Sequence, residues 1–216
     1  MSDSAAALAR DLLRIGAVAL RPDDPFTWAS GRHSPIYTDN RLTLSHPDVR
    51  SRIADAFVEI ARSFAPDAIS ATATAGIPHG ALLADRLGLP FSYVRSAPKG
   101  HGKGNRIEGA VAEGARVVLV EDLISTGGSA LSAAEALRQR GVDVVAIVAV
   151  FSYGFPEAEA AFDEAGISLA TLTGLDALAH GARETGMLAD ADRDTLDDWR
   201  RDPRAWSERW MAKQGG

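Results

Sequence analysis

The chain has 216 residues, of which 46% are hydrophobic and 24% are charged, and its formal net charge is −6. This length and balance are typical of one soluble globular domain over residues 1–216 with its own hydrophobic core. The acidic charge argues against sequence-independent binding to nucleic acid, which depends on neutralising phosphates. The absence of cysteine excludes disulfides, thiolate catalysis and cysteine-bound metals. No stretch reads as a signal peptide or a membrane span, so we expect a cytoplasmic protein.

The first third of the chain predicts two helices separated by an irregular segment. Apolar residues at helical spacing predict a helix over residues 4–19. Residues 26–44 mix aromatic, polar and turn-forming side chains, so little regular structure is expected there. A second helix is predicted over residues 47–64, with Ser45 or Asp48 as its N-terminal cap.

Strand patterns and helix patterns alternate along the next hundred residues. This alternation predicts an α/β fold with a mostly parallel central sheet that is flanked by helices on both faces. In such sheets, ligands bind beyond the carboxyl ends of the strands. The predicted strands are residues 68–72, 91–94, 117–120, 142–151 and 168–172. The predicted helices are residues 78–87, 129–140 and 157–165, followed by a polar helical tail.

The most informative segment joins an apolar strand, residues 117–120, to a helix. The strand ends in Glu121 and Asp122, and at least one of these carboxylates should face a cleft. Residues 125–129 then supply hydroxyls, glycines and backbone N–H groups at a helix N-terminus, which is a favourable place for phosphate. Carboxylates beside a phosphate site suit the hydroxyls of a phosphorylated sugar. The alternative is an ordinary solvated turn, and the glycine motifs for ATP or dinucleotides are missing.

A second segment, residues 95–106, carries four Lys or Arg side chains and one histidine but no acid. Three glycines and a proline argue against regular structure. Next to a sugar-phosphate site, such a loop would suit a lid that neutralises an anionic leaving group and excludes water. His101 would donate a proton or only bind the anion. A solvated surface loop is the alternative.

Residues 117–129 resemble the signature of the type I phosphoribosyltransferases, and residues 95–106 resemble the catalytic loop of the orotate-using members. The resemblance implies the type I fold, with a hood formed by about residues 1–45 and part of the C-terminal region, over a core of about 46–175. It implies a pentosyltransferase that transfers the phosphoribosyl group from phosphoribosyl pyrophosphate (PRPP) to orotate, giving orotidine 5′-phosphate for pyrimidine (UMP) synthesis. It also implies a homodimer with shared active sites.

The resemblance further implies residue roles on the PRPP side. Lys99, His101 and Asp122 would be catalytic, and Glu121 and Asp122 would bind the ribose hydroxyls. Mg²⁺ would be bound through the substrate, aided by these two acids, rather than by dedicated protein ligands. The residues implied to bind PRPP are Arg95, Lys99, His101, Lys103, Glu121, Asp122, Leu123, Ile124, Ser125, Thr126, Gly127, Gly128 and Ser129.

On the acceptor side, residues 26–37 resemble the segment that encloses orotate. Ser30 and Gly31 would contact orotate through their backbone, and Ser125 would contact it from the phosphate loop. Residues 72–78 resemble the family's pyrophosphate loop. The sequence departs from the family pattern where many members carry basic residues, at Ala29, Ala75 and Ser96.

Two other functions stay open on the sequence alone. One is a phosphoribosyltransferase for a purine or another base, against which residues 26–37 and 95–101 argue. The other is a PRPP-sensing regulator without catalysis, against which the acidic charge and the missing DNA-binding module argue. Trp199, Trp206 and Trp210 recur at helical spacing and predict a core or interface stripe rather than a ligand site.

Overall fold

The computed structural model describes residues 3–28, 30–97, 106–189 and 192–214. Its centre is a six-stranded sheet with the strand order β10-β9-β8-β5-β6-β7. The short β7 is antiparallel to β6, and the other neighbours are parallel, as the alternating pattern predicted. The strands are β5 (Ala68–Thr72), β6 (Phe91–Val94), β7 (Ile107–Glu108), β8 (Arg116–Ile124), β9 (Asp143–Ser152) and β10 (Ser168–Gly174).

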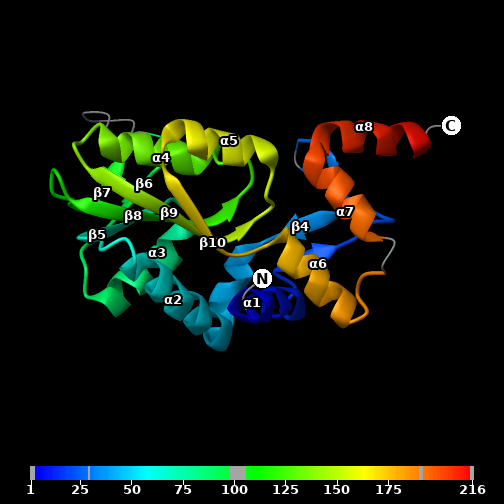
Figure 1. Cartoon of the computed structure of the whole chain (residues 1–216), viewed down its shortest axis with the longest axis horizontal. Helices are drawn as coiled ribbons and strands as arrows, with labels where there is room; N and C mark the ends of the chain where they lie inside the picture. The colour runs from blue at the N-terminus through cyan, green and yellow to red at the C-terminus, as the bar shows by residue number, and fades with distance from the viewer. Residues whose placement is uncertain (1–2, 29, 98–105, 190–191, 215–216) are drawn as a thin grey trace.

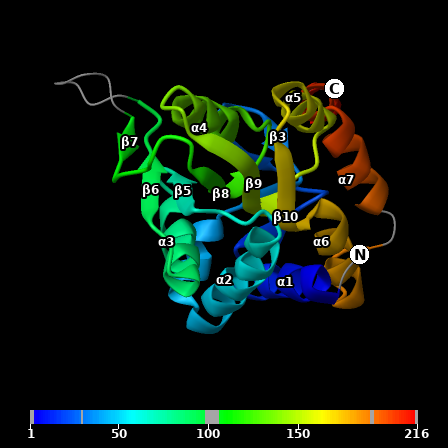
Figure 2. The same ribbon diagram turned by 60° about the vertical axis from the view of Figure 1, so that its left-hand side comes forward.

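Helices cover both faces of this sheet (Figures 1 and 2). Three helices lie on one face, α1 (Asp3–Arg14), α2 (Pro47–Arg62) and α3 (Gly76–Leu87). Two helices lie on the other face, α4 (Gly128–Arg138) and α5 (Pro156–Ala165). The prediction of a sheet between two helical layers is therefore confirmed.

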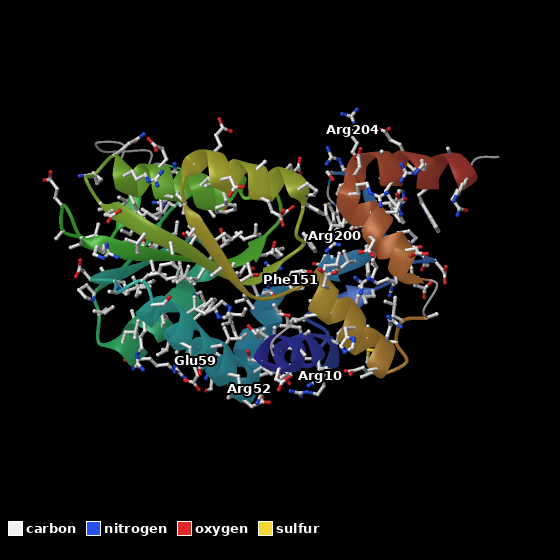
Figure 3. All side chains as sticks on the ribbon, viewed as in Figure 1. Arg10, Arg52, Glu59, Phe151, Arg200 and Arg204 are labelled. Carbon is white, nitrogen blue, oxygen red and sulfur yellow. The ribbon has the colours of Figure 1, made fainter. Side chains whose placement is uncertain are left out.

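The central strands β8 and β9 form the most deeply buried part of the core. Phe151 of β9 is fully buried, whereas Arg10, Arg52 and Arg204 lie on the periphery (Figure 3). Leu119 of β8 is also fully buried, and truncating such a side chain to alanine costs roughly 2–5 kcal/mol. The strand ends that reach the functional loops are therefore held by the most stable part of the molecule.

The chain segments between α1 and α2 and after β10 lie together beside the carboxyl ends of the strands (Figure 1). The N-terminal segment contributes two antiparallel strand pairs, and the C-terminal segment contributes three helices. These elements are β1 (Val18–Leu20) with β4 (Ile36–Thr38), β2 (Phe26–Thr27) with β3 (His33–Ser34), the 3-10 helix η1 (Asn40–Ser45), and the helices α6 (Leu175–Glu184), α7 (Asp192–Arg201) and α8 (Pro203–Gln214). Among the described residues, no helix is both long and apolar enough to span a membrane.

The end of the first helix and the cap of α2 differ from the sequence prediction. The first helix ends at Arg14 rather than at residue 19, because Gly16 adopts a φ of +72° and Val18 then begins a strand that pairs with β4. The cap predicted at the start of α2 is also wrong. The residue before the helix is His46, and no side chain caps it.

The strand predicted over residues 117–120 continues to Ile124, because β9 runs beside it for the same distance. Glu121 lies opposite Ala149, and Ile124 lies opposite Ser152. The two acids therefore belong to the strand itself rather than to a loop beyond it. Backbone pairing on one side fixes their position more firmly than a loop would.

Candidate active site

Glu121 links the end of β8 to the start of α4. Its side chain is only 5% exposed. One carboxylate oxygen accepts a hydrogen bond from the Ser129 hydroxyl at 2.8 Å, and the other accepts from the backbone N–H of Asp122 at 3.1 Å. Because both oxygens have partners, Glu121 is held in one orientation before any ligand binds.

Asp122 is less buried than Glu121, and its pKa is shifted. Burial raises the pKa of Asp122 to about 7, and the neighbouring Glu121 carboxylate acts in the same direction. Two carboxylates this close repel each other when both are ionised. Hydroxyl donors or a cation would relieve that repulsion, so the pair suits a sugar diol or a divalent metal ion.

The loop after β8 presents a helix N-terminus to the same space. Gly127 precedes α4 with a φ of +81°, and a Cβ atom there would lie 2.7 Å from the Phe162 ring. Only glycine fits this position. No side chain caps α4, so its first N–H groups stay available to an anion. The hydroxyl-bearing residues Ser125 and Thr126 precede this helix start, half-buried and exposed respectively.

Leu123 and Ile124 contribute differently from the rest of this segment. Ile124 is 1% exposed and packs in the core, and its carbonyl accepts from the backbone N–H of Tyr153 at 3.1 Å. Leu123 packs against the same core. The polar part of the predicted phosphate loop therefore begins at Ser125.

A small cavity of about 180 Å³ lies between the ends of β5 and β6 and the start of α4. It brings predicted pyrophosphate-binding segments together with the phosphate loop. The lining includes Thr72, Ala73, Arg95, Ser96, Arg106 and Ser129. The backbone N–H of Arg95 donates to the Arg106 carbonyl at 2.8 Å, which joins the two ends of the basic segment. Lys99, His101 and Lys103 lie outside the described residues.

The turn between β5 and α3 is held tightly against β8. A Cβ atom on Gly76 would lie 2.6 Å from the Val120 carbonyl oxygen, so this position requires glycine. The Thr72 hydroxyl donates to the same carbonyl at 3.2 Å. Ala75 sits at the cap of α3 without a side-chain hydrogen bond. This turn can therefore offer an anion its backbone groups but no cation.

The residues predicted to contact orotate lie at the tip of the β2–β3 pair. Ser30 and Gly31 are exposed, and Ala29 lies outside the described residues. The backbone N–H of Gly31 donates to the Trp28 carbonyl at 2.8 Å, and the φ of Gly31 is +80°. Since that N–H is used by the turn, Gly31 can offer a ligand its carbonyl oxygen only.

Four residues around the acids were not identified on the sequence. Asn40 is 1% exposed, and its amide donates to the backbone carbonyl of Asp122 at 2.7 Å. The pKa of Tyr153 is raised to about 12, mainly by burial, and Tyr37 and Asp122 act in the same direction. Asp39 raises the pKa of Arg41 through a hydrogen bond, and Tyr37 and Asp122 again add to the effect.

The shared influence of Tyr37 and Asp122 places Arg41 and Tyr153 around the same space as the acid pair. The ring of Tyr37 is 45% exposed, which is unusual for a large aromatic side chain and offers a flat apolar surface. The exposure follows from strand alternation, because Ile36, the preceding residue of β4, is buried on the opposite face.

Within the described ranges, no group of three or more His, Asp or Glu side chains is arranged to hold a metal ion. The acid pair still fits a magnesium ion that arrives with a phosphorylated substrate. Mg²⁺ prefers carboxylate and phosphate oxygens, and it commonly uses only one or two protein carboxylates.

Comparisons with known proteins agree with this geometry. A model of the phosphoribosyl transferase domain matches residues 43–165, which are more than half of the chain. The orotate phosphoribosyltransferase of Bacillus pumilus (strain SAFR-032) is 54% identical over 208 residues, covering 95% of this chain and 97% of that protein. That of Lactococcus lactis subsp. cremoris (strain SK11) is 52% identical over 202 residues, covering 93% of this chain and 97% of that protein.

The crystal structure of orotate phosphoribosyltransferase from Aeropyrum pernix is similar to this one with a TM-score of 0.73 at 32% identity, covering 84% of this chain and 99% of that chain. The fold is therefore that of the type I phosphoribosyltransferases, as the resemblance implied. A matching domain over more than half of the chain and relatives above 50% identity over nearly all of it show that this chain belongs to the orotate phosphoribosyltransferase family.

Proposed function

We propose that this protein transfers the phosphoribosyl group of PRPP to orotate, giving orotidine 5′-phosphate and pyrophosphate for pyrimidine synthesis. The observation that carries the proposal is the acid pair of buried Glu121 and half-buried Asp122, at the end of the strand that leads to an uncapped helix N-terminus. An acid pair and an anion site at this spacing match a sugar that carries both a diol and a phosphate. The activity is the one named for the relatives that cover nearly the whole chain.

PRPP would bind by its 5′-phosphate at residues 125–129. Its 2′- and 3′-hydroxyls would donate to Glu121 and Asp122, which removes part of the repulsion between the two carboxylates. The pyrophosphate would extend toward the cavity beside Arg95, where the turn before α3 offers backbone groups. Because Glu121 is already oriented by Ser129, little side-chain ordering is needed on binding.

In the reaction, a ring nitrogen of orotate forms a bond to C1′ of the ribose while the bond from C1′ to the pyrophosphate oxygen breaks. The electron pair of that bond leaves with pyrophosphate. Arg95, Lys99 and Lys103 would neutralise the growing charge, and His101 would donate a proton to pyrophosphate or bind it. On the opposite side of the sugar, Asp122 and Glu121 would favour the positive charge that develops on the ribose.

Mg²⁺, when bound with PRPP, would serve as a template and neutralise phosphate charge. Glu121 and Asp122 are the protein groups that would help to hold it, through the oxygens that also meet the ribose. We also propose a cytoplasmic homodimer in which residues 95–106 of each subunit reach the neighbouring site. The hood would comprise about residues 1–45 with part of the C-terminal region, and the core about residues 46–175.

The test is pyrophosphate release from PRPP with orotate, adenine, guanine or hypoxanthine as acceptor, with Mg²⁺ and with a chelator. We expect release with orotate and Mg²⁺ only, and its loss in Asp122→Ala. Release with a purine instead would identify another base as the acceptor. Binding of PRPP without release would indicate a sensor, and a mass consistent with a monomer in solution would contradict the dimer.

A further inference from the structure

Trp199 of α7 joins the two ends of the chain beside the proposed site. It is fully buried, and its ring meets Trp28 edge-on at 6.1 Å between centroids. The same ring meets Tyr153 at 5.3 Å and Phe155 at 5.1 Å. Trp28 also stacks on Tyr153 at 6.2 Å. One buried side chain of the C-terminal region therefore contacts both the β2–β3 pair and the end of β9.

Ser207 of α8 adds a polar link to the same strand pair. Its hydroxyl oxygen accepts a hydrogen bond from the backbone N–H of His33 at 2.9 Å, across 174 positions of sequence. Ser207 is 1% exposed, so water does not compete for this bond. His33 of β3 lies opposite Thr27 of β2. α8 therefore holds β3 by a hydrogen bond, while Trp199 of α7 packs against Trp28, which directly follows β2.

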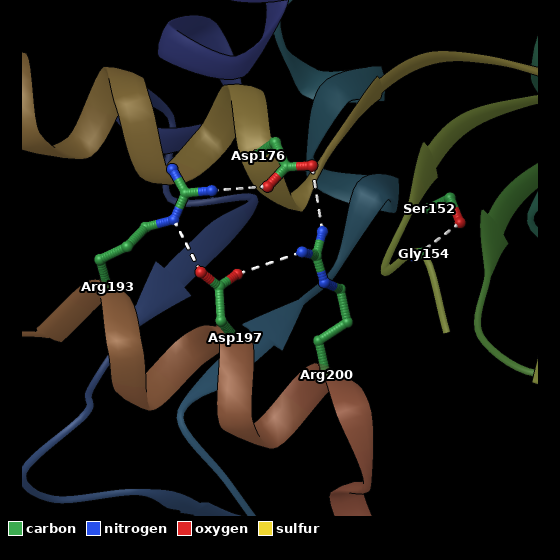
Figure 4. Close-up of polar contacts among 6 residues, drawn as sticks. All are labelled: Ser152, Gly154, Asp176, Arg193, Asp197 and Arg200. Carbon is green, nitrogen blue, oxygen red and sulfur yellow. Dashed lines mark hydrogen bonds and ion pairs between the residues drawn. The ribbon is translucent and has the colours of Figure 1, made fainter. Parts of the chain in front are cut away.

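The helix α7 is itself fixed to α6 by a closed ring of four ion pairs (Figure 4). Arg193 contacts Asp176 at 2.9 Å and Asp197 at 3.1 Å, and Arg200 contacts the same two acids at 3.0 and 3.1 Å. Partly exposed pairs of this kind add little stability one by one. Their closed arrangement nevertheless fixes the direction of α7, and so the place of Trp199.

The strand pair needs such support because it is very short. β2 and β3 have two residues each, and an isolated two-stranded hairpin is marginally stable in water. Its tip carries Ser30 and Gly31, which the proposed function assigns to the acceptor base. The position of that tip must therefore come from the elements that pack against the hairpin.

We infer that α7 and α8 position the hairpin of residues 26–34 for acceptor binding, and that Trp199 and Ser207 are positioning residues for orotate. The inference rests on the proposed function. On this inference, the C-terminal helices support only the part of the site that binds orotate. The part that binds PRPP is supported by the central sheet. The two substrates should therefore respond differently when these contacts are removed.

The test compares Ser207→Ala with Ser207→Thr, which keeps the hydroxyl, and with Thr185→Ala. Thr185 bonds the carbonyls of Gly181 and Ala182 through its hydroxyl, and both partners lie in α6 rather than in the hairpin. In Ser207→Ala, the KM for orotate should rise by about five- to ten-fold while the KM for PRPP stays within about two-fold. Ser207→Thr should recover most of the orotate affinity, and Thr185→Ala should leave both KM values unchanged.

Trp199→Phe tests the packing separately, since the indole N–H has no hydrogen-bond partner among the described residues and none is lost. We expect the same rise in the orotate KM. Equal changes in both KM values, or an unchanged orotate KM in both variants, would overturn the inference.

Amide exchange at His33 supplies a readout that needs no substrate. It should accelerate in Ser207→Ala by about ten-fold, and not in Thr185→Ala. If the wild-type protein does not use orotate, the proposed function fails, whereas an unchanged exchange rate at His33 refutes the positioning role itself.

Discussion

The amide of Asn40 donates a hydrogen bond to the backbone carbonyl of Asp122 at 2.7 Å, and so ties η1 to the acid pair across 82 positions of sequence. Asn40 is almost completely buried, and its side-chain oxygen Oδ1 has no hydrogen-bond partner among the described residues. A buried amide with one unused acceptor is costly unless its position matters. The bond fixes the backbone at the residue whose carboxylate the proposed mechanism needs.

Asn40→Ala should therefore impair PRPP use. Loss of this buried bond should cost about 1–3 kcal/mol of stability and raise the KM for PRPP by about ten-fold, because the Asp122 backbone is released. Thr173→Ala is a matched control, since it removes a buried hydroxyl that donates to the Ala5 carbonyl at 2.9 Å. The control should lose similar stability, measured by urea unfolding, but keep its KM. Equal kinetic effects in both variants would refute the role of Asn40.

Asp122 should make the ligand-free protein less stable as the pH rises. Its pKa is raised to about 7 in the folded state, against about 3.9 in an unfolded chain. Between these values the folded state holds more protons, so the free energy of unfolding falls with increasing pH. Asp122→Asn should lose that decline and exceed the wild type by on the order of 2 kcal/mol at pH 8. Thermal melts between pH 4 and 8 measure this, with the exposed Asp163→Asn as control, and parallel curves would contradict it.

Alanine substitutions at the two glycines at the start of α4 should have different effects, one on stability and the other on PRPP binding. Gly127→Ala forces a side chain into left-handed backbone and against Phe162, and should destabilise the fold by about 1–3 kcal/mol. At Gly128 the nearest atom to an added Cβ is the Thr126 hydroxyl at 3.8 Å, so Gly128→Ala should fold normally. The added methyl group should instead occupy space needed by the phosphate and raise the PRPP KM by about ten-fold. A normal PRPP KM in Gly128→Ala would place the phosphate elsewhere.

Lysine substitutions test the role of the basic segment, residues 95–106. Two of the three lysines of the chain lie in this segment, and the third, Lys213, supplies a control. Lys99→Ala should lower kcat by about 10²- to 10³-fold, the usual loss when one charge-stabilising donor is removed. Its melting temperature should not change. Lys213→Ala removes an exposed cation near the end of α8 and should leave kcat unaffected. Comparable kcat values for both variants would exclude Lys99 from the reaction.

Most of the sheet could be predicted because its strands are continuous apolar runs. β5 and β6 have the predicted bounds: β5 is an apolar run that is followed by a helix pattern, and β6 ends where the glycine-rich basic segment begins. The extension of β8 through Glu121 and Asp122 could not be predicted. Acids are unfavourable in strands, and only the neighbouring β9 supplies the pairing that overrides this preference.

The segment that we propose binds phosphate could be picked out in the sequence because its residues are contiguous. The contacts of Asn40 and Trp199 were not visible, because each joins segments that are distant in sequence. The tryptophan stripe was predicted to be core or interface, and burial confirms this for Trp199 and Trp206. Its connection to Trp28 has no local pattern that could have indicated it.

The bond from His33 to Ser207 also has a consequence for biosynthesis. A ribosome makes the hairpin of residues 26–34 before the helix that holds it, since His33 and Ser207 are 174 positions apart. At about 5–20 residues per second, the hairpin waits roughly ten seconds or more for its support. Nascent or prematurely terminated chains that stop before α8 would carry a finished sheet and phosphate loop beside an unsupported hairpin.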